Sequence, residues 1–226
     1  MLQKASSQLT SNSIGLFSKT TKDRILESSL ILFNESGFNN VTTALIAKHT
    51  GILEGSLWYH FNSKKDILSV HIQLLMKMFL SANQKSKSKN FDTIIFEFFQ
   101  SYDIIWDFRY ILRDNFQKSF VDDETVLSSV IDINKYLDQW AENRIKHSLE
   151  SGLLEINSKE IENLSEIILV IGRYWLDFSM KKYPDVNVNS LRVKGLQHII
   201  TILKPYLNPK GISIIENVLN NTNKVQ

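Results

Sequence analysis

The sequence contains no cysteine, only three prolines and eight glycines in 226 residues, and a formal net charge of only +2. Without thiols the chain can form neither a disulfide nor a thiolate metal site. Few helix-breaking residues together with long periodic apolar stretches predict an all-α protein. No run of about 18 apolar residues offers a membrane span, and the region from Leu2 to Leu16 is too polar for a signal peptide. We therefore expect a cytoplasmic protein that makes no membrane contact.

The stretch from Thr42 to Phe61 is predicted to form two short helices joined by a sharp turn. The Thr42 hydroxyl can cap the first helix, and Leu45 and Ile46 fall on the face expected to be buried. Gly51 stands where that helix must stop, and glycine tolerates the left-handed conformation that such a turn requires. The pattern is typical of a helix-turn-helix.

The second helix of this pair has two chemically different faces. Leu57 and Phe61 are four residues apart and can both face a core. The other side chains point away from that core, and they are Ser56, Trp58, Tyr59 and His60. A short polar and aromatic face of this kind suits the DNA major groove, which admits one α-helix.

The flanking segments complete a compact helical module. Thr20 and Thr21 can cap a helix that ends at Gly37. Downstream, Ser63 and Asp66 form the ends of a capping box. Behind that box, apolar residues recur at helical spacing, namely Leu68, Ile72, Leu75 and Phe79. Three helices and the start of a long fourth are therefore expected.

Four segments in this order, ILESSLILFNESGF, VTTALIAKHTG, GSLWYHF and NSKKDIL, resemble the N-terminal DNA-binding domain of the TetR family of bacterial transcriptional regulators. The resemblance covers about residues 20 to 70. It implies nine or ten helices, a homodimer, and a larger C-terminal helical domain that binds a small-molecule inducer and dimerises. The expected partners are a palindromic double-stranded DNA operator and that inducer, with no cofactor.

The resemblance assigns DNA contacts to individual residues. Thr42 and Thr43 match the start of the helix that touches phosphate, and Lys64 matches a lysine that commonly grips the DNA backbone. The recognition helix matches at Gly55, Ser56, Trp58, Tyr59 and His60. Other roles stay open from the residues alone: Trp58 and Tyr59 can be packing residues, His60 a helix cap, and Lys64 a solvated side chain.

Leu53 and Glu54 depart from the family pattern, which usually has a small hydroxyl residue followed by Lys or Arg there. An acidic group near phosphates is unfavourable, but the helix dipole favours Glu54 in the first turn. Its carboxylate can also accept a hydrogen bond from a cytosine amino group. We predict an unusual operator that Glu54 helps to select. Leu45 also replaces a position that is often acidic in the family.

Charge contributes little to the expected DNA affinity. Between Lys19 and Asp66 there are six basic and five acidic residues, a balance of +1. Affinity must then come from shape, from a few phosphate contacts and from two half-sites bound by a dimer.

The sequence suggests three parts. Residues 1–18 are polar, lack helical periodicity and are expected to be a disordered tail. Residues 19–70 are the predicted helix-turn-helix domain, and residues 71–226 are the predicted ligand-binding and dimerisation domain. The polar stretch from Gln84 to Asn90 reads as a connection between helices.

The larger domain offers two candidate groups of ligand-binding residues. Near the aromatic-rich start of this domain are four charged residues, Asp103, Asp107, Arg109 and Arg113. No acidic residue among them lies three or four positions from a basic one, so their partners must come from another helix, water or a ligand. Further on, Val126, Val130, Ile133, Leu137 and Trp140 form one apolar face that continues into Arg144 and His147. Either this face runs out into solvent with Arg144 snorkelling, or the two polar residues are anchors in an apolar cavity. The candidate ligand residues are Tyr102, Trp106, Arg109, Arg113, Trp140, Arg144, His147 and Trp175.

A later helix is apolar nearly all round and is expected to pack on both sides. Its stripe comprises Ile161, Leu164, Ile168, Ile171, Trp175 and Phe178, and the helices from about Glu160 and about Ser190 are candidates for a dimer interface.

An enzyme is not expected, because the five histidines are scattered and no metal-ligand, glycine-loop or nucleophile motif is present. The alternative is a helical adaptor or small-molecule-binding protein that does not bind DNA.

Overall fold

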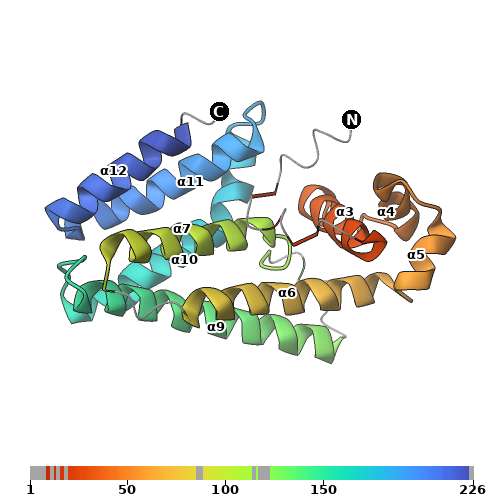
Figure 1. Cartoon of the computed structure of the whole chain (residues 1–226), viewed down its shortest axis with the longest axis horizontal. Coiled ribbons are helices and arrows are strands. Elements are labelled where there is room, and N and C mark those ends of the chain that lie inside the picture. Colours follow the sequence, from red (N-terminus) through yellow and green to blue (C-terminus); the bar gives the residue numbers. More distant parts are fainter. Residues whose placement is uncertain are drawn as a thin grey trace. The chain divides into compact units, whose positions relative to one another are not determined.

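The computed structural model describes residues 9–10, 13, 16–17, 20–84, 89–113, 116 and 123–223. In these residues every regular element is a helix, and the β-type pairing is limited to an isolated antiparallel bridge between Leu154 and Leu207 (Figure 1). The all-α prediction is therefore confirmed. No helix within the described ranges is long and apolar enough to cross a bilayer.

The chain packs into two compact units, which are described separately. Unit 1 comprises Met1–Ser81 and Asp103–Asn134, and unit 2 comprises Ala82–Tyr102 and Lys135–Gln226. Packing therefore groups residues 103–134 with the N-terminal part of the chain, whereas the sequence pattern suggested a division by chain order.

Three helices continue from one unit into the other. They are α6 (Lys64–Gln84), α7 (Phe91–Asp107) and α9 (Glu124–Glu150), and the limits of the two units fall inside each of them. Of the expected connection between α6 and α7, residues 85–88 lie outside the described residues.

Unit 1 is built on α3 (Thr21–Ser36), α4 (Thr43–Thr50) and α5 (Glu54–His60), together with its parts of α6, α7 and α9. Thr20 caps α3 through a capping box with Asp23, and the backbone turns away at Gly37 with φ 79°. The apolar face of α3 is buried, with Ile25, Leu30 and Phe33 fully covered. The predicted first helix is therefore confirmed.

Of the tail expected to be disordered, residues 1–18, the structure describes residues 9–10, 13 and 16–17, and most of these are buried in unit 1. Leu9, Thr10, Ser13 and Phe17 are almost completely covered, whereas Leu16 is 40% exposed. Thr10 supplies a reason, because its backbone N–H (2.9 Å) and its hydroxyl (2.5 Å) donate to the carboxylate of Asp107. Burial raises the pKa of Asp107, and a buried carboxylate needs such donors.

A buried polar network centred on His71 lies in the core of unit 1. Its Nε2 is 3.0 Å from the carbonyl oxygen of Leu26, and its Nδ1 is 2.9 Å from the hydroxyl of Tyr110. Because a carbonyl only accepts, Nε2 carries the proton and Nδ1 accepts from Tyr110, which is the arrangement of a neutral imidazole. Burial lowers the pKa of His71 to about 4 and raises that of Tyr110.

Unit 2 contains the remaining parts of α6, α7 and α9 with α10 (Ile161–Lys182), α11 (Val188–Leu203) and α12 (Pro209–Asn223), and the short turns η1 (Ser158–Glu160) and η2 (Lys204–Tyr206). Its core is aliphatic, with Leu164, Ile168, Leu196, Ile199 and Leu203 among its buried members. Asn157 caps η1 through Lys159 N–H, and α10 begins directly after this short turn.

Gly195 allows α11 to approach two aromatic side chains closely. A Cβ at this position would lie 2.4 Å from Cδ1 of Trp175 and 2.5 Å from the hydroxyl oxygen of Tyr102. Both rings are held in place, because Trp175 donates to Leu191 O (2.7 Å) and Tyr102 donates to Arg192 O (2.9 Å). Through these two hydrogen bonds, Trp175 of α10 and Tyr102 of α7 hold α11 in place.

We predict that His71 makes unit 1 sensitive to acid. The pKa of His71 is about 4 in the folded protein and about 6.5 when unfolded, so the unfolded state binds the extra proton first and stability falls as pH drops from about 6.5 to 4. The full contribution is about 3 kcal/mol. Denaturant unfolding at several pH values should show a shallower decline for His71→Gln than for the wild type. Parallel declines would contradict a buried neutral histidine.

Candidate functional site

The turn between α4 and α5 has the geometry expected of a helix-turn-helix. Gly51 is left-handed, with φ 73° and ψ 37°, as predicted, and its N–H closes the end of α4. Ile52 N–H donates to Ala47 O at 3.0 Å, which folds the chain back on α4. The guanidinium of Arg24 donates to Thr50 O, so α3 is tied to the same corner. Local backbone bonds thus fix the direction in which α5 leaves the turn.

Helix α5 has one buried face and one exposed face. Leu57 and Phe61 are buried, as predicted, while Tyr59 is 86% exposed and Trp58 is 43% exposed. His60 is half-buried, and its ring lies edge-on to that of Tyr59, with 5.2 Å between centroids. The side chains at Trp58 and Tyr59 are therefore largely available to a partner outside the chain.

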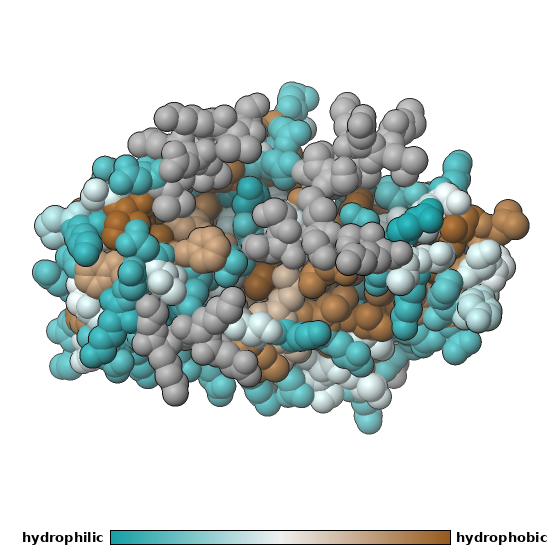
Figure 2. All heavy atoms as spheres, viewed as in Figure 1, coloured by the Kyte–Doolittle hydropathy of each residue, from teal (hydrophilic) through white to brown (hydrophobic). Residues whose placement is uncertain are grey.

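Apolar side chains also reach the surface where α4 and α5 form the edge of unit 1 (Figure 2). Leu53, at the N-cap of α5, is 80% exposed, and Leu45 on α4 is 39% exposed. The prediction that Leu45 lies on the buried face is wrong. Ile46 and Ala47 fill that face instead, because the short helix can present only a narrow stripe to the core.

Gly55 is a glycine that the fold itself does not require. A Cβ added there would meet no atom of the chain within 4 Å, and both Gly55 and Ser56 are exposed. The missing side chain instead leaves room for another molecule to approach the α5 backbone closely.

At the start of α4, the hydroxyl groups of Thr42 and Thr43 form different hydrogen bonds. Thr42 Oγ1 accepts from Leu45 N–H at 3.2 Å, so the predicted cap is confirmed and the hydroxyl proton can still be donated. Thr43 Oγ1 donates to Glu54 Oε1 at 2.7 Å. Because a hydroxyl has one proton to donate, Thr43 cannot give it to a phosphate while it is bonded to Glu54.

Lys64 is anchored to the loop that precedes α4. Its ammonium donates to Phe38 O (2.7 Å) and Val41 O (2.8 Å) and lies 4.3 Å from the centre of the Phe38 ring. Burial lowers the pKa of Lys64. The side chain is therefore not simply solvated, and two of its three donors bind the loop.

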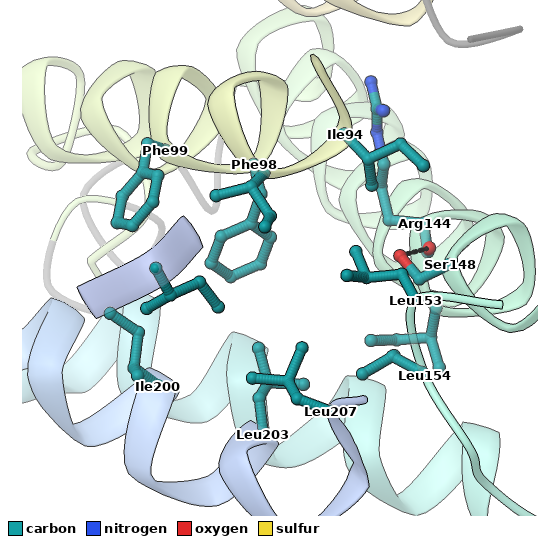
Figure 3. A pocket seen from close by; sticks show the side chains of 13 residues that line it. Ile94, Phe98, Phe99, Arg144, Ser148, Leu153, Leu154, Ile200, Leu203 and Leu207 are labelled. Carbon is teal, nitrogen blue, oxygen red and sulfur yellow. Dashed lines mark hydrogen bonds between the residues drawn. The ribbon is translucent and has the colours of Figure 1, made fainter. Parts of the chain in front are cut away.

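A cavity lies inside unit 2 (Figure 3). Its empty space is about 510 Å³, which includes space that is open to solvent. Helix α7 supplies Phe98 and Phe99, and α11 supplies Ile200 and Leu203. The remaining lining residues are Ile94, Ile95, Arg144, Ile145, Ser148, Leu153, Leu154, Leu207 and Ile215. The wall is therefore almost wholly apolar.

Arg144 lines this cavity and forms a buried ion pair with Glu97 of α7. Its Nη1 is 2.5 Å from Glu97 Oε2, and the two side chains are only 5% and 3% exposed. The interpretation in which Arg144 snorkels into solvent is therefore wrong. The stripe on α9 stays buried through Val126, Ile133 and Trp140, and Arg144 can remain on it because Glu97 compensates its charge.

The other predicted ligand residues are not brought together around this cavity. Tyr102 and Trp175 bind the backbone of α11, and Trp140 is buried on the α9 stripe. His147 is half-buried but does not line the cavity. Of the eight candidates, Arg144 alone lines this cavity.

Three of those candidates belong to unit 1, where they make contacts within the protein. Arg109 donates to Trp106 O (2.8 Å) and stacks over the Trp106 ring at 5.0 Å. Arg113 donates to Asn34 O at 3.4 Å. From the sequence alone their partners could be protein or ligand, and these contacts are with protein.

Most residues that line the cavity were not predicted from the sequence, because they are apolar and have no charged or polar group to mark a site. Phe98, Phe99, Ile200 and Leu203 are apolar, and nothing in their spacing distinguishes a cavity wall from a packed core. Ser148 follows Arg144 by one helical turn and could have been noticed at that spacing. Nowhere in the described ranges do three or more His, Cys, Asp or Glu side chains group in a way that could hold a metal ion.

Comparison with known proteins identifies the family. Residues 25–70 match the model for bacterial regulatory proteins of the tetR family, and residues 68–213 match that for a bacterial transcriptional repressor of the same family. The chain belongs to the TetR family. It is a TetR-family transcriptional regulator, and its relatives are regulators and not enzymes, as predicted.

Among its relatives is the IcaR protein of Staphylococcus aureus strain Newman, described as a negative transcriptional regulator of a biofilm operon. The two are 24% identical over 167 residues, which is 71% of this chain and 86% of the relative. A TetR-family regulator from Marinobacter aquaeolei VT8 shares the fold with a TM-score of 0.70 and 23% identity, over 90% of this chain and 98% of that one. A putative fatty acid metabolism regulator from Clostridium perfringens has a TM-score of 0.54 and 16% identity, over 82% and 99% of the two chains.

Adjacent lysines on α6 give a matched test of the Lys64 anchor. We expect Lys64→Met to lower the free energy of unfolding by about 1–2 kcal/mol, because two carbonyl oxygens lose a charged donor. Lys65→Met should change it by less than about 0.5 kcal/mol, since the Lys65 side chain is 60% exposed and pairs with Asp123 at the surface. Denaturant titrations of both variants measure the difference. Equal effects would mean that the loop does not depend on Lys64.

Proposed function

We propose that this TetR-family regulator represses transcription by binding a palindromic DNA operator as a homodimer, with α5 in the major groove. The exposure of Tyr59 and Trp58 on a helix with a buried opposite face is the observation that carries the proposal. A major groove admits one helix whose outward side chains reach base edges. The S. aureus relative is named a negative regulator, which supports repression over activation.

Phosphate and base contacts are divided between α4 and α5. The hydroxyl proton of Thr42 and the N-terminal amides of α4 suit phosphate oxygens, which accept hydrogen bonds and favour helix N-termini. Ser56, Tyr59 and His60 reach the bases, and Gly55 lets the backbone approach. Lys64 holds the loop before α4 and has one donor left for a phosphate.

Glu54 selects the operator sequence in this proposal. Its bond from Thr43 keeps the carboxylate at the start of α5, where the helix dipole favours negative charge. A carboxylate can accept from the exocyclic amino group of cytosine but repels phosphates. Beside it, the exposed Leu53 suits the methyl group of thymine, which is an apolar feature of the same groove.

The homodimer forms through unit 2, and α10 supplies its apolar face. Ile167, Val170, Tyr174 and Phe178 recur three to four residues apart and are all exposed, Val170 and Phe178 to 56%. A row of this kind on one helix is typical of a face that packs against another chain. The C2 symmetry of such a pair matches a palindromic operator.

The cavity in unit 2 binds a small hydrophobic or amphipathic ligand that releases the repressor. Its lining is almost wholly apolar, and small-molecule sites are mostly apolar. Helix α7 provides a covalent route for the signal, because it carries Phe98 in the cavity wall and ends in unit 1 at Asp107. The ligand would favour the conformation with lower operator affinity.

Footprinting on the DNA upstream of the chain's own coding sequence tests the proposal. We expect the wild type to protect a palindrome whose half-sites lie about one helical turn, roughly 34 Å, apart. Val170→Glu combined with Phe178→Glu should prevent dimerisation and weaken binding by about a hundredfold or more. Ile131→Glu, on the exposed part of α9 in unit 1, serves as the control and should bind normally. Absence of any footprint at low salt would favour the adaptor and refute the regulator proposed here.

Selection from random duplex DNA tests the role of Glu54. The wild type should prefer cytosine at one position of each half-site, and Glu54→Ala should lose that preference, which is worth about 1–3 kcal/mol of discrimination. Glu35→Ala, an exposed acidic residue near the end of α3, controls for the change in net charge. An unchanged consensus for Glu54→Ala would exclude Glu54 as a base-reading residue.

A further inference from the structure

The cavity of unit 2 offers almost no polar group to a ligand. Of its lining residues, Arg144 and Ser148 are polar and the others are aliphatic or phenylalanine. Ser148 donates its hydroxyl proton to Arg144 O at 2.8 Å, one turn earlier in α9. That proton is therefore already used, and the hydroxyl can offer a ligand only its lone pairs.

Arg144 does not present an uncompensated positive charge to the cavity. Glu97 neutralises it at 2.5 Å, and both side chains are almost completely buried. Figure 3 shows the guanidinium turned away from the centre of the cavity. The basic residue on the wall is thus part of an internal ion pair, which a ligand would have to break before using it.

Beside the buried Nε of Arg144, the carboxylate of Glu97 also keeps unmet hydrogen-bonding capacity. Its Oε1 is buried and accepts no hydrogen bond from any described residue. Because this oxygen has no donor to screen its charge, the free-energy cost of bringing a second negative charge near it is higher. A carboxylate ligand would therefore lose its hydration beside a carboxylate that is already buried.

We infer that the cavity takes an uncharged, largely aliphatic ligand and discriminates against the matching carboxylate. This inference rests on the proposed ligand-binding function of unit 2 and adds the charge of the ligand to it. The Glu97–Arg144 pair determines this selectivity, because it removes the one cation that could attract an anion to the wall. The ligand then owes its affinity to apolar burial against Phe98, Phe99, Ile200 and Leu203.

Calorimetric titration with matched ligand pairs tests the inference. Linear alcohols of eight, ten and twelve carbons are compared with carboxylates of the same lengths at about pH 8, where a carboxylic acid is ionised. We expect the best alcohol to bind wild-type protein more than about tenfold tighter than the carboxylate of equal length. The alcohols should also release operator DNA at lower concentrations than the carboxylates of equal length.

A charge variant separates the ion pair from simple hydrophobicity. Glu97→Gln leaves Arg144 without its carboxylate, so the preference should shift toward the carboxylate ligand by about tenfold or more. Glu142→Gln, which removes the acid of a surface pair with Lys146 on the same helix, should leave the preference unchanged. Combining Glu97→Leu with Arg144→Met removes both charges and should keep the preference for alcohol, which covers the case in which Glu97→Gln fails to fold.

The outcomes distinguish this inference from the proposed function. Equal or tighter binding of carboxylates by the wild type, with operator release, overturns the uncharged ligand and leaves the ligand-responsive regulator standing. An unchanged preference in folded Glu97→Gln protein overturns the role of the ion pair. Absence of binding by every alcohol and carboxylate overturns the inference and also the cavity as inducer site, while the operator footprint still tests DNA binding.

Discussion

The buried ion pair between Arg144 and Glu97 is the interaction on which the interior of unit 2 depends. Two charges in an apolar core are stable only when they compensate each other, and removal of one partner leaves the other at a cost of several kcal/mol. The pair joins α7 to α9 beside the cavity. It therefore fixes two walls of the cavity and at the same time sets the electrostatic character of the space between them.

The same requirement explains the buried polar groups of unit 1. Asp107 is held by the backbone and hydroxyl of Thr10, and His71 stays neutral between Leu26 O and Tyr110. Each group is compensated by residues distant in the sequence, including a segment whose polarity suggested disorder. In this protein, pairing decides which polar residues can enter the core.

Periodicity and local signals predicted the helices, because they depend on residues within one or two turns. The Thr42 cap, the Gly51 turn and the buried Leu57 and Phe61 are of this kind, and all were recognisable from spacing. The role of Arg144 was not, because its partner lies 47 residues away on another helix. Nor were the bonds of Lys64 to its loop and of Thr43 to Glu54, which form only when separate segments fold together. An apolar cavity at Arg144 was one of two alternatives, but its apolar lining was not predicted, because apolar residues facing a space have the same pattern as those facing a core.

Release of an operator requires that the ligand bind two conformations with different affinities. In the proposed function, the cation on the cavity wall is already paired with Glu97, so the difference must come from apolar area that is buried in one conformation and open in the other. Each additional buried methylene contributes about 0.8 kcal/mol, so two methylenes suffice for roughly a tenfold shift in operator affinity per protomer. In the proposed function, an ion pair between α7 and α9 beside an apolar wall therefore suits a sensor of uncharged aliphatic molecules.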